Sequence, residues 1–337
     1  MDIEKLRNIA KKFVASRKGI LAADASNNTM NKRLAAIGVE QTEEMRRQYR
    51  QLLFTTPGIE KYISGVILYD ETIRQKTDEG ISMPSLLASK GIMPGIKVDE
   101  GLVQNPQSPN EQITTGLQGL AERLLEYKKL GAVFTKWRAT YIIADGLPTK
   151  EDITLDAWIL GQYAKISQDV DMVPIVEPEV LMDGNHTITR CKEVTIAVQK
   201  QLFAELKVRG VYMPGVILKT NMVLAGKDSF TKISPEEVAD HTLSALQETV
   251  PSDIGGVVFL SGGQSPKQAT ENLQYISSRS KYPWQMTFSY SRALQEPVLE
   301  SWLGKLENMP RAQEIFLHRL HMNSLAREGQ YTEELDR

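Results

Sequence analysis

Eight short apolar runs recur along the chain, and most of them are separated by segments with the periodicity of an amphipathic helix. Each run is rich in Val, Ile or aromatic residues, and most have Gly or Pro nearby, which is typical of β-strands. The runs cover residues 18–24, 64–70, 93–99, 132–138, 172–179, 215–221, 255–263 and 284–290. Because strands that alternate with helices form parallel βα units, this order predicts a parallel sheet covered by helices.

Helical patterns lie between these runs, with clear examples at 114–131, 188–207 and 234–250. The last begins with Ser-Pro-Glu-Glu, an N-cap followed by proline and acidic residues. Eight βα repeats predict an α/β fold made of a single (β/α)8 TIM barrel, which takes about 250 residues. The remainder of the 337 residues is expected to form extra N- and C-terminal helices. An open doubly wound sheet is the alternative, but no G-x-G-x-x-G follows the first run. With no linker or low-complexity segment, residues 1–337 are expected to form one domain.

Composition excludes several classes of protein. The formal charge is −2 with no basic arm, which gives no sign of a nucleic-acid partner. Cys191 is the only cysteine, so no intrachain disulfide is possible and a reducing compartment is expected. The N-terminus is charged from its second residue, and no apolar run approaches the roughly 20 residues that span a bilayer. We therefore expect a soluble, cytoplasmic protein without a membrane partner.

Polar residues gather where the predicted strands end, which is where barrel enzymes place their active sites. Side chains two positions apart in a strand lie on the same face, so four pairs of polar residues with this spacing should point in the same direction. The pairs are Lys97 with Asp99, Lys136 with Arg138, Glu177 with Glu179, and Lys219 with Asn221. Pro174 and Pro178 predict an irregular fifth strand. A single charged residue at a strand end is often only solvated or ion-paired, but six strands ending this way predict a charged cavity.

Two kinds of chemistry suit these residues. A lysine among other cations has a depressed amine pKa and can attack a carbonyl carbon. Lys219 follows an apolar run and has Lys136 as a candidate cationic neighbour, while Glu177 or Glu179 could transfer protons as the carbinolamine loses water.

The second chemistry is phosphate binding. Ser261, Gly262 and Gly263 lie between a strand and a helix predicted to start near Ser265, so free backbone amides and a helix N-terminus form an anion site. Arg292 follows the eighth strand, close to where this fold usually binds phosphate. A metal site is not expected, because none of the four histidines lies at a strand end: they are His186, His241, His318 and His321.

The motifs, in order, resemble those of the class I (Schiff-base) fructose-1,6-bisphosphate aldolases. They are "GILAADAS", "GIKVD", "FTKWR", "VPIVEPE", "DGNH", "LKTNMV", "FLSGGQS" and "FSYSRALQ", and the match runs from about residue 4 to about 331. The resemblance implies a homotetramer of TIM barrels in glycolysis and gluconeogenesis. It also implies reversible cleavage of D-fructose 1,6-bisphosphate to dihydroxyacetone phosphate and glyceraldehyde 3-phosphate, with no metal or other cofactor.

The resemblance also implies the role of each residue. Lys219 corresponds to the Schiff-base lysine, and Glu177 to the acid/base of carbinolamine formation and dehydration. Asp24 corresponds to the aspartate of proton transfer at the C4 hydroxyl, with Lys136 and Glu179 as its electrostatic partners. One phosphate site is implied for Arg292 with Ser261, Gly262 and Ser289. Contacts with the rest of the substrate, including the other phosphate, are implied for Ser26, Arg33, Lys97 and Arg138.

The sequence departs from the family pattern at four positions near these motifs. Ala25 stands in place of a usual Glu, Pro214 of a Glu, Thr220 of a Pro, and Ser291 of a Gly beside Arg292. A side chain at 291 restricts the backbone if its φ is positive. The chain also stops at "YTEELDR", without the tyrosine-ended tail of animal members. The alternatives are an aldolase that prefers a related sugar phosphate, such as fructose 1-phosphate, and a non-catalytic barrel that binds sugar phosphates.

Overall fold

The computed structural model describes residues 1–279 and 282–336, and within them eight parallel strands close into a barrel. The strands follow one another around the barrel in the order β1-β10-β9-β8-β7-β6-β3-β2. Their bounds are β1 (Gly19–Ala22), β2 (Ile63–Leu68), β3 (Met93–Lys97), β6 (Phe134–Tyr141), β7 (Val173–Val180), β8 (Ile217–Thr220), β9 (Gly256–Phe259) and β10 (Met286–Tyr290). Each lies within or overlaps one of the eight predicted runs, so the predicted fold class is confirmed.

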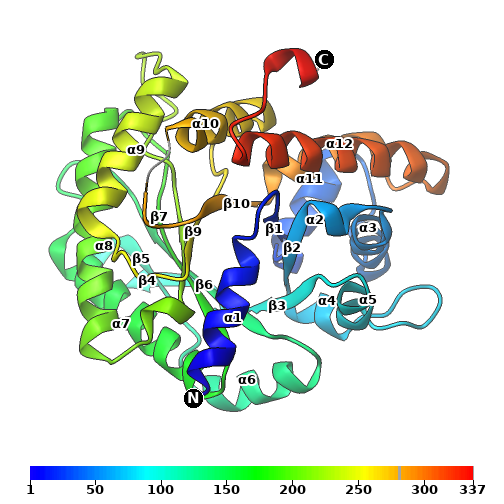
Figure 1. Cartoon of the computed structure of the whole chain (residues 1–337), viewed down its shortest axis with the longest axis horizontal. Coiled ribbons are helices and arrows are strands. Elements are labelled where there is room, and N and C mark those ends of the chain that lie inside the picture. The colour runs from blue at the N-terminus through cyan, green and yellow to red at the C-terminus, as the bar shows by residue number, and fades with distance from the viewer. Residues whose placement is uncertain (280–281, 337) are drawn as a thin grey trace.

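Helices surround the barrel, as Figure 1 shows for α7 to α10 on one side and α3, α11 and α12 on the other. Their bounds are α1 (Ile3–Phe13), α2 (Asn27–Ala36), α3 (Glu43–Thr55), α4 (Asp70–Arg74), α5 (Met83–Ser89), α6 (Leu120–Lys129), α7 (Lys150–Asp169), α8 (Ile188–Val208), α9 (Pro235–Thr249), α10 (Pro266–Ser278), α11 (Arg292–Trp302) and α12 (Met309–Arg327). Short 3-10 helices are η1 (Ile59–Lys61), η2 (Met213–Gly215), η3 (Leu306–Asn308) and η4 (Glu333–Asp336). Within the described residues, no helix is both long and apolar enough to cross a bilayer.

An antiparallel hairpin, which the sequence analysis did not predict, stands between β3 and β6. It consists of β4 (Leu102–Asn105) and β5 (Ser108–Thr114). Because β5 continues to Thr114 and Gly119 has a left-handed φ of 64°, helix α6 begins only at Leu120. The helix predicted for 114–131 was therefore wrong over its first turn and a half.

Helix α1 closes the amino-terminal end of the barrel, and in Figure 1 it crosses the middle of the strands. Its buried face places Phe13 against Phe134 from β6, with ring centroids 4.6 Å apart in an edge-to-face arrangement. Phe134 in turn fills the space beside Gly95, where a Cβ atom would lie 2.2 Å from the ring. The inside of the barrel is therefore packed at this end.

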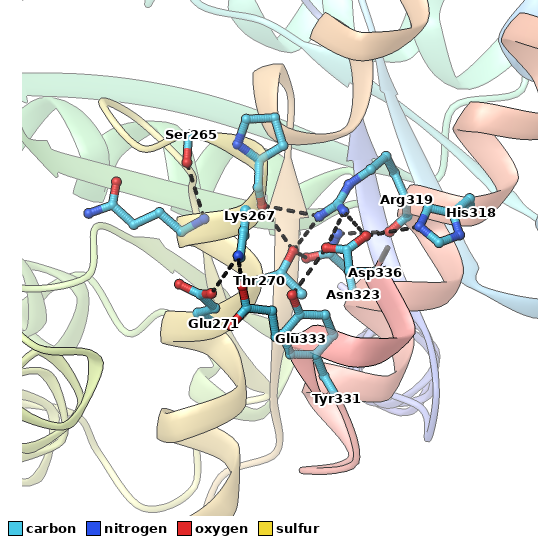
Figure 2. A network of polar contacts seen from close by, with 12 residues as sticks. Ser265, Lys267, Thr270, Glu271, His318, Arg319, Asn323, Tyr331, Glu333 and Asp336 are labelled. Carbon is cyan, nitrogen blue, oxygen red and sulfur yellow. Dashed lines mark hydrogen bonds and ion pairs between the residues drawn. The ribbon is translucent and has the colours of Figure 1, made fainter.

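The C-terminal segment is fixed to helices α10 and α12 by a buried ion pair, shown in Figure 2. Nη1 of Arg319 donates to both carboxylate oxygens of Asp336 at 2.7 Å. Nη2 of Arg319 donates to Thr270 Oγ1 at 2.6 Å and to the carbonyl of Pro266 at 3.1 Å. His318 Nε2 lies 2.9 Å from Asp336 Oδ1. One guanidinium group therefore joins α12, η4 and the first turn of α10.

Candidate active site

A cavity of about 1260 Å³ opens at the carboxyl ends of the barrel strands. Almost every residue that the sequence analysis proposed for the site lines it: Asp24, Ser26, Arg33, Lys97, Lys136, Arg138, Glu177, Glu179, Lys219, Ser261, Gly262, Ser289 and Arg292. The predicted charged cavity is therefore present, and it brings together residues from seven of the eight barrel strands or the loops that follow them.

Lys219 lies near the end of β8, and its amine reaches the centre of the cavity. Its side chain is 4% exposed, and Nζ lies 3.0 Å from Oε1 of Glu177 on β7. Two residues earlier in the strand, Ile217 packs into the apolar interior of the barrel. The alternation of strand side chains thus places Lys219 directly above the packed core.

Lys136 on β6 joins the other half of this cluster. Its Nζ lies 2.6 Å from Glu177 Oε2 and 2.8 Å from Asp24 Oδ2. Phe134, Lys136 and Arg138 alternate along β6, so the first fills the barrel while the two cations face the cavity. The result is a continuous chain of four buried charges: Lys219, Glu177, Lys136 and Asp24.

These neighbours determine the charge of each buried group. Burial alone raises the pKa of Asp24, but Lys136 and then Lys219 outweigh it and hold that pKa well below the usual range. The pKa of Glu177 is also lowered: burial raises it, but Lys136 and Lys219 together lower it by more. For Lys136, burial lowers the pKa, while Asp24 and Glu177 raise it above its usual value. Both carboxylates are therefore ionised, and Lys136 is protonated, at neutral pH.

Two further ion pairs lie toward the mouth of the cavity. Lys97 Nζ lies 2.5 Å from Asp99 Oδ1, and Nε of Arg138 donates to Glu179 Oε2. Burial lowers the pKa of Arg138, but Glu179 raises it more, so the net shift is upward. Lys97 and Arg138 thus provide cations nearer to solvent than the central four.

The turn after β9 has the features of an anion site. Ser265 is the N-cap of α10, and its hydroxyl accepts a hydrogen bond from the Gln268 amide. Ser289 on the adjacent β10 is 1% exposed, and its Oγ has no hydrogen-bond partner among the described residues. Arg292 follows at the start of α11, and no described carboxylate lies within ion-pair distance of it. A free hydroxyl and a free guanidinium group on one wall are a suitable environment for phosphate oxygens.

Two details predicted from the sequence were wrong. Asn221 does not point into the cavity with Lys219, because its side chain bonds to the Val180 amide and to Thr195. Gly263 is not among the residues that line the cavity and packs against Met182 with φ of +74°, so its part in the anion site stays a prediction. Strand β7 is regular despite its prolines, since it pairs with β6 through eight consecutive residues.

The sequence analysis missed lining residues from the hairpin and the outer helices. They are Thr114 at the end of β5, Arg123 on α6, and Tyr69 and Arg74 around α4. Tyr69 could have been found, because it lies at the end of the second apolar run, where the same strand-end rule applies. For Thr114 the only sequence signal was the glycines Gly101 and Gly116 on either side of a short polar stretch, which marks a hairpin weakly.

The four departures from the family pattern fall in different environments. Ser291 has φ of −107°, so its side chain causes no left-handed strain. Thr220 is fully buried and accepts a hydrogen bond from Gln199 on α8, away from the cavity. Pro214 lies in η2, before β8 begins. Ala25 lines the cavity but offers no polar atom on its side chain.

A closed parallel barrel with a lysine, carboxylates and arginines at the carboxyl ends of its strands defines a barrel enzyme that acts on small anionic substrates. Comparison with known proteins gives the family. The family model for class I fructose-bisphosphate aldolase matches residues 5–337, and the chain belongs to this family.

Individual relatives agree. Fructose-bisphosphate aldolase 2 of Plasmodium berghei is 49% identical over 330 residues, 97% of this chain and 89% of that relative. The aldolase of Plasmodium falciparum is 48% identical over the same shares. A solved structure of fructose-bisphosphate aldolase from Plasmodium falciparum, in complex with TRAP and a small-molecule inhibitor, has a TM-score of 0.97. It covers 98% of this chain and 96% of that one, at 48% identity.

The predicted family, fold class and enzyme class are therefore confirmed: the chain is a fructose-bisphosphate aldolase of class I, a lyase. The alternatives of a fructose 1-phosphate enzyme and of a non-catalytic barrel are not favoured by these similarities.

Proposed function

We propose that this enzyme cleaves fructose 1,6-bisphosphate through an imine formed on Lys219, with no metal. The observation that carries the proposal is the 3.0 Å separation between Lys219 Nζ and Glu177 Oε1 inside a buried cavity. At this distance a proton passes directly from the ammonium group to the carboxylate. The neutral amine that results attacks the C2 carbonyl carbon of the open-chain sugar.

Glu177 then returns the proton. The carbinolamine hydroxyl takes it and leaves as water, and an iminium ion with positive charge on the lysine nitrogen remains. This charge replaces that of the original ammonium group beside Glu177, so the balance of the four-charge cluster is restored. Lys136 lies 2.6 Å from the other oxygen of Glu177 and stays protonated. Its positive charge stabilises the ionised carboxylate, so Glu177 releases its proton readily.

Asp24 carries out the second half of the reaction. As an ionised carboxylate it accepts the C4 hydroxyl proton while the C3–C4 bond breaks and its electron pair moves into an enamine conjugated with the lysine nitrogen. Glyceraldehyde 3-phosphate leaves first. Asp24 then gives its proton to C3 of the enamine, and hydrolysis of the imine releases dihydroxyacetone phosphate and regenerates Lys219 and the ionised Asp24.

The two phosphates require cations on opposite sides of this cluster. We assign one phosphate to Ser261, Gly262, Ser289 and Arg292. Ser26, Arg33, Lys97 and Arg138 are assigned to the remainder of the substrate and the other phosphate. A bisphosphate of this kind places the activity in glycolysis and gluconeogenesis.

Borohydride trapping tests the imine. With fructose 1,6-bisphosphate present, reduction followed by peptide mass spectrometry is expected to find a triose or hexose phosphate adduct on Lys219. Lys219→Ala is expected to lose turnover and the adduct, whereas Lys200→Ala, at an exposed lysine on α8, keeps both. An adduct on a different lysine, or full turnover after Lys219→Ala, would contradict the assignment.

Full activity in EDTA is expected, and loss of activity there would contradict metal independence.

The assembly and location are proposals of the same kind. We infer a homotetramer, as the family resemblance implies, and a cytoplasmic location, because a single cysteine favours a reducing compartment. Large apolar side chains on the surface of the isolated chain support an interface, among them Trp158 at 42% and Val208 at 82% exposure. Light scattering on the purified protein is expected to give four times the mass of 37.8 kDa, and a monomer mass would contradict the inference.

A further inference from the structure

Ser291 is the N-cap residue of α11, yet its hydroxyl does not cap the helix. The other serine and threonine N-caps of the described helices each accept a hydrogen bond from the backbone amide three residues later. They are Ser26, Thr42, Ser82, Thr149, Thr187, Ser234 and Ser265. Ser291 Oγ accepts instead from Arg33 Nη1 and from Gln295 Nε2, both at 3.3 Å. A group that usually stabilises its own helix is here used to hold a guanidinium group from α2.

Gln295 fixes the position of this hydroxyl from one turn further along α11. Its side chain is completely buried, and Nε2 also donates to the carbonyl of Ala22 on β1 at 2.8 Å. Its Oε1 accepts from Arg50 Nη1 at 3.2 Å, and its backbone carbonyl accepts from the Tyr49 hydroxyl at 3.1 Å. With both ends of the amide occupied, Gln295 cannot flip without losing hydrogen bonds.

The arginines in this chain of contacts lack carboxylate partners. Neither Arg33 nor Arg50 has a described carboxylate within 4 Å, and the same holds for Arg292. Burial lowers the pKa of Arg50 to about 10; Arg33 lowers it further, while Tyr49, Asp24 and Glu71 oppose the shift. Burial also lowers the pKa of Arg33; Arg292 lowers it further, while Tyr49, Asp24 and Glu296 oppose the shift. An excess of positive charge therefore faces the cavity on this wall, and an anion is its natural complement.

We propose that Ser291 is a positioning residue, which holds Arg33 beside Arg292 so that both guanidinium groups bind the substrate phosphate at that wall, with Gln295 and Arg50 fixing Ser291 from behind. This inference rests on the proposed function for its substrate, and it moves Arg33 from the rest of the substrate, where the resemblance puts it, to the phosphate that Arg292 binds. The hydroxyl of Ser291 thereby gains a role in substrate binding. Because Ser291 acts through Arg33, its effect is on binding and not on the imine steps at Lys219.

Steady-state kinetics with fructose 1,6-bisphosphate tests the role. Ser291→Ala is expected to raise KM about fivefold with kcat unchanged within twofold, since one charge-assisted hydrogen bond is lost. Ser291→Thr keeps a hydroxyl and is expected to keep KM within twofold. Ser301→Ala, at a half-buried serine near the end of the same helix, is the matched control with unchanged constants. A fall in kcat with unchanged KM for Ser291→Ala would overturn the proposal.

A double-mutant cycle shows whether Ser291 acts through Arg33. Arg33→Ala alone is expected to raise KM at least tenfold, and adding Ser291→Ala should then change KM by less than twofold. Full additivity of the two changes would overturn the proposal.

Calorimetric binding of inorganic phosphate provides a readout that does not depend on turnover. Affinity is expected to fall about fivefold in Ser291→Ala and to stay unchanged in Ser301→Ala. If the wild type binds phosphate in this pattern but does not cleave the bisphosphate, the proposed function fails and the inference stands. If cleavage is normal and phosphate affinity is equal in all variants, the inference fails alone.

Discussion

Asp156 on α7 is a fully buried carboxyl group, and no described cation lies within ion-pair distance of it. Burial raises its pKa to about 8, with Asp152 and Glu111 adding to the effect and a backbone hydrogen bond from Thr114 opposing it. Asp152, bonded to Asn105 on the hairpin, has a pKa raised to about 6, again mainly by burial. Asp156 is thus held as the neutral acid at neutral pH, behind the hairpin that borders the cavity.

The raised pKa predicts that stability falls as the pH rises. Between the unfolded pKa near 3.8 and the folded pKa near 8, the folded chain binds a proton that the unfolded chain has lost. Each pH unit in this window reduces the free energy of unfolding by about 1.4 kcal/mol for one such group. Urea unfolding from pH 5 to pH 8 is expected to show a falling midpoint, and a smaller fall for Asp156→Asn. Equal slopes for both proteins would contradict this.

Lys136 is the group that does most to lower the pKa of the two proposed catalytic carboxylates, Asp24 and Glu177. Replacing it by methionine, Lys136→Met, removes this cation. Both pKa values should rise, so the acid limb of the kcat–pH profile is expected to move to higher pH. We also expect kcat to fall about 100-fold at neutral pH. A profile with an unmoved acid limb would show that Asp24 does not titrate as the base.

At the scale of secondary structure, the barrel strands could be predicted because each is a short apolar run bounded by turn residues. Hairpin β4–β5 could not, because its strands are mostly exposed and carry no apolar alternation. The positions of Lys136 and Glu177 followed from strand alternation. The orientation of Asn221 did not, because β8 ends at Thr220 and the strand rule no longer applies one residue later. Which carboxylate meets which lysine depends on strand order around the barrel, which local sequence does not encode.

The ion pair between Arg319 and Asp336 fixes η4 to α10 and α12. Arg319→Ala leaves the buried carboxylate of Asp336 without its cation, and it also removes the hydrogen bonds that Arg319 donates to Thr270 and to the carbonyl of Pro266. We expect a loss of about 3 kcal/mol in the free energy of unfolding, measured by urea denaturation. Arg311→Ala, at an exposed pair with Glu314 on the same helix, is the control with a loss below about 1 kcal/mol. Similar losses for the two variants would contradict the importance of the buried pair.

For the whole molecule, closure of the barrel by α1 links the first residues of the chain to strands far along it. We propose that the chain is one domain, so far-UV circular dichroism and tryptophan fluorescence are expected to report the same urea midpoint. Phe13→Ala removes a fully buried ring from between α1 and Phe134 and should cost about 4 kcal/mol in both signals. A first transition seen by one signal alone would show that α1 and the barrel unfold separately.

The single cysteine has a practical consequence for labelling. Cys191 on α8 is 2% exposed, and burial raises the pKa of its thiol, so little thiolate is available to a maleimide dye. The folded wild type is expected to take up no dye, and the urea-unfolded chain one per molecule. A cysteine introduced at an exposed polar position of α8, Lys200→Cys, would then carry the only reactive thiol on the folded surface. The native sequence thus serves as its own cysteine-free background for fluorescence experiments, with no need to remove Cys191 first.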